Sequence, residues 1–330
     1  EPIVMGHLPI DVLPGLVPPL EDHRLGLTAL QRRLLRLAGP ALQEVLEVEV
    51  VADAKPGEHE PRFRSKVLPH GLAPLPPLLL AGPQPSPGRA EIVTGRMLGQ
   101  LALQAGVPVD VMASRVFPTG HAGFFAALQH AQVQVIGARR AELAVVGGVD
   151  SYLDLYRLAL LDQEDRLLTF GVQDAFTPGE GAAFVLVASR NACQRYRLAP
   201  LAWIDAVGVA QEPGHRYSEQ AYLGEGLAAA VGQVLGPPGP PVRLVMAGVN
   251  GESMFAKEWG VAYVRNRERF AEPLRIEHSA EYTGDAGAAL APMMLGAAVL
   301  GMRDGDVEGP ALVWASSEQA QRGALAVRAS

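Results

Sequence analysis

Residues 142–149, ELAVVGGV, are the stretch of this chain that says most about its fold. After Glu142 the run is continuously apolar or small, which is typical of a strand in a sheet covered on both faces. The preceding residues, 121–138, place Phe125, Leu128 and Val135 at helical spacing, so a helix is expected to lead into the strand. This part of the sequence therefore predicts a layered α/β protein.

On both sides of this stretch, predicted strands alternate with predicted helices. We expect helices at residues 89–106, 217–235 and 286–300 and strands at residues 182–188, 201–210, 242–249, 311–315 and 324–328. Two proline-rich runs, residues 72–88 and 236–241, are predicted as loops, because proline fixes φ and lacks an N–H donor. The second half repeats the first in element order, so we divide the chain into halves at residues 1–188 and 189–330.

The composition limits the classes of protein to which this chain can belong. The chain has 330 residues, 48% of them hydrophobic, and a net charge of -7 without a Lys/Arg-rich run, which argues against a nucleic-acid partner. The single cysteine, Cys193, excludes an internal disulfide, and the start lacks the pattern of a signal peptide. The longest apolar stretches, such as residues 288–300, are too short to span a membrane. A cytoplasmic protein without a metal or cofactor is expected, since no metal-ligand spacing or phosphate loop is present.

Three segments resemble a known family. They are residues 147–150 (GGVD), 174–187 (DAFTPGEGAAFVLV) and 281–289 (EYTGDAGAA). Together they are similar to the Gly-Gly strand end, the Gly-Glu-Gly-Ala turn and the second-histidine motif of β-ketoacyl synthases in the thiolase superfamily. The resemblance implies a five-layered αβαβα fold made of two similar halves, and a homodimer formed across a sheet edge.

Both ends of the chain depart from the family. The strand and helix with which family members open are not recognisable in residues 1–46, so the chain is expected to begin inside the domain. The family's glycine-rich turn near the last strands is matched by residues 315–321, ASSEQAQ, which contain no glycine.

The family's nucleophilic cysteine has no counterpart at its expected position. Such a cysteine lies where a strand turns into a buried helix, and matching residues 117–131 to that segment puts His121 in its place, after Thr119. A helix N-terminus repels a cation, so we expect a neutral His121 that acts as a base or, preferably, only hydrogen-bonds a backbone carbonyl. Phe124 and Phe125, which follow, line or fill the former acyl cavity, although core positions are the commoner role for such spacing.

The segment of the family's first histidine is residues 248–255, GVNGESMF, and contains no histidine. Asn250, Glu252 and Ser253 are the candidate pocket residues there. Glu252 is either a base for a different reaction or a turn residue that is solvated or binds a backbone amide, because Asn250-Gly251 is a strong turn signal.

The second-histidine position falls on Tyr282, and the family's upstream lysine falls near Glu277 or His278. Tyrosine donates hydrogen bonds but is a poor base at neutral pH, because its pKa is about 10. A register change of one residue would bring His278 or Tyr282 toward the pocket, but we prefer a core or supporting role for both.

A synthase-like fold that lacks the family's catalytic cysteine and histidines suggests a catalytically inactive binding or accessory protein. Residues 117–121 (FPTGH), 250–253 (NGES) and 255–260 (FAKEWG) resemble bacterial thiolase-like proteins associated with type VI secretion. One alternative is a non-catalytic partner subunit of an active ketosynthase, as in chain-length factors. Another is an acyltransferase or thioesterase in which His121, Glu252 and Tyr282 converge on an open cavity. The partners expected are a secretion component, an active ketosynthase or an acyl group.

Overall fold

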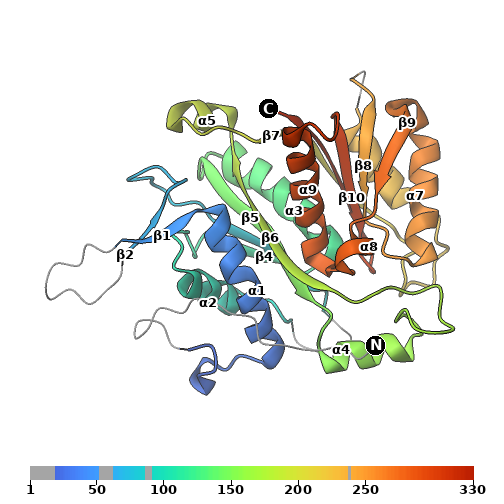
Figure 1. Ribbon diagram of the computed structural model, residues 1–330, viewed down its shortest axis with the longest axis horizontal. Coiled ribbons are helices and arrows are strands. Elements are labelled where there is room, and N and C mark those ends of the chain that lie inside the picture. The colour runs from blue at the N-terminus through green and yellow to red at the C-terminus, as the bar shows by residue number, and fades with distance from the viewer. Residues whose placement is uncertain (1–18, 52–61, 86–90, 237–238) are drawn as a thin grey trace, which may run out of the picture.

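The computed structural model describes residues 19–51, 62–85, 91–236 and 239–330, and two β-sheets stacked face to face organise them (Figure 1). Helices α3 (Gly123–His130) and α9 (Leu290–Asp304) pack between the sheets and share their core. The outer faces are covered by α1 (Ala29–Val45) and α2 (Gly95–Ala105) on one side and by α6 (Glu225–Val234) and α7 (Ser253–Arg265) on the other. The predicted αβαβα layering is confirmed.

The two sheets share one strand pattern. The first has the order β4 (Arg115–Phe117), β3 (Leu78–Ala81), β5 (Leu143–Ser151), β6 (Glu180–Ala188). The second has the order β7 (Ala202–Gln211), β11 (Gln321–Ala329), β10 (Ala311–Ser316), β8 (Val242–Ala247), β9 (Phe270–Glu277). In both, two neighbouring parallel pairs are followed by one antiparallel pair, so β4-β3-β5-β6 corresponds to β9-β8-β10-β11. The repetition expected from element order is thus visible in the topology.

The Gly-Gly pair in β5 lets other backbone segments approach the strand closely. A Cβ atom on Gly148 would lie 2.2 Å from the carbonyl oxygen of Ala288, and one on Gly147 would lie 2.4 Å from that of Ala183. All nine residues of β5 are buried. At the end of the strand, Asp150 Oδ2 accepts the Ala288 N–H at 3.0 Å, which attaches the short helix η5 (Gly287–Ala289) to β5.

Three local predictions are wrong. Residues 78–81 form the buried strand β3 inside the run predicted as a loop; Pro77 stands just before it and contributes its carbonyl, which accepts the Val145 N–H. Helix α6 begins at Glu225 rather than residue 217, after Gly224 at φ 69°. The helix expected to continue to residue 138 changes at residue 131 into the π-helix η3 (Ala131–Gly137).

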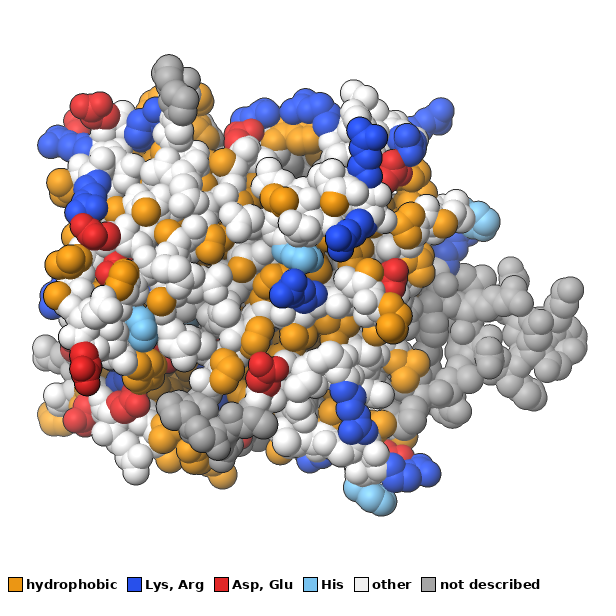
Figure 2. All heavy atoms as spheres, turned by 180° about the vertical axis from the view of Figure 1, so that it is seen from behind, with side chains coloured by type: hydrophobic (Ala, Val, Ile, Leu, Met, Phe, Trp, Pro, Cys, Tyr) orange, Lys and Arg blue, Asp and Glu red, His pale blue; other side chains and the backbone are white. Residues whose placement is uncertain are grey.

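Shorter elements complete the fold: η1 (His23–Leu25), the hairpin of β1 (Val48–Val51) and β2 (Arg62–Ser65), η2 (Gly120–Ala122), α4 (Leu155–Gln163), α5 (Arg190–Tyr196), η4 (Arg267–Arg269) and α8 (Ala280–Thr283). None of the described helices is both long and apolar enough to cross a lipid bilayer. On the face shown in Figure 2, basic and acidic side chains are interspersed among apolar and uncharged atoms.

Candidate functional site

His121 lies in η2, the single turn that joins β4 to α3, and only 3% of the residue is exposed. The β10–β11 turn holds this segment in place. Ser317 Oγ donates a hydrogen bond to the Thr119 carbonyl oxygen at 2.5 Å and accepts one from the Ala122 N–H at 3.0 Å. These hydrogen bonds fix the His121 segment of the first sheet against the β10–β11 turn of the second.

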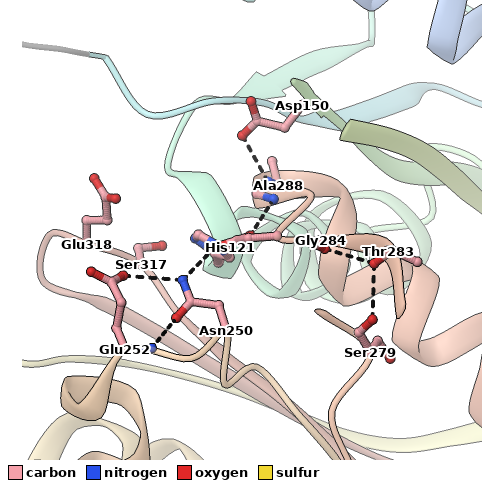
Figure 3. Close-up of polar contacts among 12 residues, drawn as sticks. His121, Asp150, Asn250, Glu252, Ser279, Thr283, Gly284, Ala288, Ser317 and Glu318 are labelled. Atoms are coloured by element: carbon pink, nitrogen blue, oxygen red, sulfur yellow. Dashed lines mark hydrogen bonds and ion pairs between the residues drawn. The ribbon is translucent and has the colours of Figure 1, made fainter. Parts of the chain in front are cut away.

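Asp285 is the partner of His121. Figure 3 shows His121 close to Asn250, the second residue whose side chain hydrogen-bonds Asp285. His121 Nε2 lies 2.7 Å from Asp285 Oδ1, which also accepts the Gly287 N–H at 2.8 Å. Asn250 Nδ2 donates to Asp285 Oδ2 at 2.7 Å. Both side chains of the His121–Asp285 pair are buried.

The surroundings of the pair favour opposite charges on its two members. Burial alone lowers the pKa of His121, but the adjacent Asp285 carboxylate outweighs it, and the pKa lies above its ordinary value of 6.5. Burial alone raises the pKa of Asp285, but His121, Asn250 and the Gly287 N–H bring it below 3.8. The expectation of a neutral His121 considered only the helix N-terminus, whereas the adjacent carboxylate favours the imidazolium.

Within the second-histidine motif, the residue that lies at the site is Asp285 and not Tyr282. Tyr282 is 81% exposed, and His278 contacts Glu281 Oε1 through Nδ1 at 3.2 Å on the surface. Neither residue lies at the pocket, which corrects both expectations. The available signal was an acidic residue, Asp285, directly after Gly284 and within the small-residue run of this motif.

Glu252 is buried between two arginines and is not a solvated turn residue. Arg166 donates to both Glu252 oxygens, from Nε at 2.9 Å and Nη2 at 3.0 Å, and Arg216 Nη2 donates to Oε1 at 2.5 Å. Arg166 Nη2 also donates to Glu318 at 2.6 Å, and this ion pair lowers the pKa of Glu318 against the effect of burial. Asn250 Nδ2 lies 3.3 Å from Glu252 Oε2 and so joins this group to Asp285.

The two arginines and Glu318 were missed by the sequence analysis. Arg166 follows α4, Arg216 follows β7, and Glu318 belongs to the β10–β11 turn. They belong to three separate loops, so no local sequence motif predicts that they lie together.

A cavity of about 320 Å³ borders His121. Its walls come from η2, β5 and the residue after it, α4, the segment after β7 and the β10–β11 turn, and include His121, Asp150, Tyr152, Arg157, Tyr217 and Glu318. Of the residues predicted for the site, only His121 lines it. The predicted convergence of His121, Glu252 and Tyr282 on one open cavity is therefore not found.

The remaining pocket candidates lie elsewhere. Phe124 and Phe125 are fully buried in the core between the sheets, and Phe125 packs so closely on Gly323 that a Cβ there would lie 2.2 Å from its ring. Ser253 hydrogen-bonds Asp174 through its N–H and hydroxyl. Thr119 reaches the site only through its carbonyl oxygen, which accepts from Ser317.

Comparison with known proteins finds structural similarity without sequence similarity. No protein-family model and no curated protein matches the chain. The fold matches the ketosynthase domain KS7 of OzmH for oxazolomycin from Streptomyces albus JA3453, with 15% identity, a TM-score of 0.63, and coverage of 78% of this chain and 55% of that one. It also matches the ishigamide ketosynthase/chain length factor, with 16% identity, a TM-score of 0.62, and coverage of 78% and 76%.

A third similar structure is AntDE:AntF, a type II polyketide synthase acyl-carrier protein in complex with its ketosynthase. Identity is 16%, the TM-score 0.59, and coverage 72% of this chain and 67% of that one. The chain spans only about half of the OzmH domain. These similarities show that the chain has a ketosynthase-like α/β fold of the thiolase type.

Proposed function

We propose that this chain is a non-condensing binding protein on a ketosynthase-like scaffold. The observation that carries the proposal is the buried His121–Asp285 ion pair at the position where the resemblance expects a cysteine thiol. A condensing enzyme needs a thiolate to accept the acyl group and a base to move a proton. The chain's one cysteine, Cys193, lies on α5.

The groups around His121 are poorly suited to acid–base chemistry. The Nε2 proton of His121 is shared with an ionised carboxylate, and the amide of Asn250 does not titrate. Glu252 accepts hydrogen bonds from Arg166 and Arg216, so both of its carboxylate oxygens are already engaged by arginine side chains. The network is consistent with a site whose charged side chains are paired with one another.

Binding to another protein is the role that suits such a scaffold best. We propose a cytoplasmic bacterial accessory protein with a component of type VI secretion as partner, on the resemblance of residues 117–121, 250–253 and 255–260. A second candidate is a partner subunit of an active ketosynthase. The likeness to a ketosynthase/chain length factor and to a ketosynthase bound by its acyl-carrier protein favours it.

Association with a second copy is also part of the proposal. Strand β4 is an edge of the first sheet, paired with β3 on one side. Light scattering of the purified chain is expected to give twice the monomer mass. Affinity capture from the native cytoplasm then separates the partners, since a secretion component and a ketosynthase subunit are different proteins.

Thioester turnover tests the absence of chemistry. The purified chain is incubated with acyl-CoA and acyl-carrier thioesters, beside an active ketosynthase as positive control, and thiol release and intact mass are followed. We expect no release and no acyl adduct. Turnover that is lost in His121→Ala but kept in the surface variant His278→Ala would overturn the proposal in favour of an acyltransferase or thioesterase.

A further inference from the structure

We propose that the cavity beside His121 binds a small uncharged molecule through a carbonyl oxygen. This inference rests on the proposed binding function and assigns a ligand class to the cavity. It differs from an acyl-chain site, because it concerns a compact molecule held by two cationic donors at one end and by aromatic rings at the other.

The first donor is His121. Its Nε2 is held by Asp285, so the ring does not turn freely, and its Nδ1 makes no hydrogen bond to any residue in the described ranges. His121 lines the cavity, so the cavity is the place from which a partner for this nitrogen can come. The imidazolium form, which Asp285 favours, donates from Nδ1 and takes a hydrogen-bond acceptor as its partner.

The second donor is Arg157 of α4. Its Nη1 donates to Asp150 Oδ1 at 2.6 Å and to the Ser151 carbonyl at 2.5 Å, and the guanidinium carbon lies 4.3 Å from the centre of the Tyr152 ring. Its Nε and Nη2 make no hydrogen bond within the described part of the chain, although Arg157 lines the cavity. These contacts fix the side chain and leave N–H donors for a ligand.

The charge balance favours an uncharged ligand. His121 is paired with Asp285, Arg157 with Asp150, and Arg166, which also lines the cavity, with Glu252 and Glu318. A bound anion would add a charge beside Asp150 and Glu318, which also line the cavity, and a bound cation would add one beside Arg157. A carbonyl oxygen supplies the missing acceptor without either repulsion.

The size and walls of the cavity select a compact, partly apolar molecule. A volume of about 320 Å³ lies at the small end of ligand sites. Tyr156, Leu160 and Tyr217 form its apolar walls. Phe124 and Phe125 are packed in the core between the sheets and do not enlarge the cavity with aromatic walls of their own.

Three nearly isosteric probes test the ligand class: benzamide (uncharged), benzoate (anionic) and benzamidine (cationic). Binding to the full chain is measured at neutral pH by ligand-observed NMR titration. We expect benzamide to bind at least about tenfold more tightly than benzoate or benzamidine, as loss of a hydrogen bond to a charged donor or like-charge repulsion would give. Arg157→Met should weaken benzamide binding by about tenfold or more.

Two variants keep the test independent of folding. Leu160→Trp fills the cavity without touching a charge and should abolish benzamide binding, while His278→Gln on the surface should leave it unchanged. The inference is overturned if benzamide fails to bind, if benzoate binds as tightly, or if Leu160→Trp has no effect while its thermal unfolding matches the wild type. If benzamide does not bind and no thioester turnover is seen, only this inference is overturned. Thioester turnover would overturn the proposed function.

Discussion

Two groups of buried charges in this molecule have similar chemistry and different surroundings. The cavity cluster consists of His121, Asp150, Arg157, Arg166, Asn250, Glu252, Asp285 and Glu318, and part of it borders open space. The turn cluster consists of Arg322 and Glu258, which have no exposed side-chain surface. Arg322 Nη1 donates to the carbonyls of Ser317, Gln319 and Gln321, so this cluster shapes the β10–β11 turn. Charges that face a cavity can serve a ligand, whereas those packed against backbone serve the fold.

The largest effect is expected in the turn cluster. Arg322→Met removes the partner of the fully buried Glu258 and three hydrogen bonds to the turn, and should lower the free energy of unfolding by about 3–5 kcal/mol. Urea unfolding measures it. Arg328→Met is the matched control, since its pair with Asp205 is largely exposed and worth about 0–1 kcal/mol. Equal losses in the two variants would contradict the structural role of Arg322.

Asp285→Asn should be the next most costly change. It removes the charge that His121 and Asn250 share, at almost constant volume, and should reduce the free energy of unfolding by about 2–3 kcal/mol. Asp304→Asn, in an exposed pair with Arg303, is the control and should change little. A loss below that of the control would show that the His121–Asp285 pair is not formed in solution.

The same pair predicts how stability depends on pH. The folded-state pKa of His121 is raised, so its contribution is complete below the unfolded pKa of about 6.5 and is lost as the pH rises through the folded value. The folded-state pKa of Asp285 is lowered, so its contribution is complete above about 3.9 and is lost on acidification. Urea unfolding from pH 5 to 9 should therefore show an alkaline loss in the wild type that Asp285→Asn lacks. Parallel curves would contradict this assignment.

Ser317→Ala tests the connection between the two clusters. Ser317 Oγ bridges the backbone on either side of His121, and its removal leaves a buried N–H of Ala122 without its partner, at a cost of about 1–2 kcal/mol. Because Arg322 holds the same turn, the double variant with Arg322→Met should lose less than the sum of the single losses. Strict additivity in urea unfolding would show that the clusters are independent.

The sequence predicted what local patterns control and missed what separate loops assemble. The apolar run ending in Gly147-Gly148 indicated a buried strand, because only small residues allow the backbone of η5 to approach. Strand β3 was missed because the prolines around it predicted a loop. The N–H group that a proline lacks matters little at the start of a strand. The position of His121 followed from its helix, but Arg166 and its partners did not, since their meeting depends on tertiary packing.

The smallest effect is expected at Tyr282, the residue that the motif alone placed in the site. Its side chain is 81% exposed and its substitution by alanine should change the free energy of unfolding by less than about 0.5 kcal/mol. Benzamide binding should also be unchanged, whereas Asp285→Asn should weaken it, because the charge on His121 then loses its support. If Tyr282→Ala impaired binding and Asp285→Asn did not, the motif would have been the better guide. The expected result would instead show that Asp285 differs from Tyr282, three residues earlier, because Asp285 is buried beside His121.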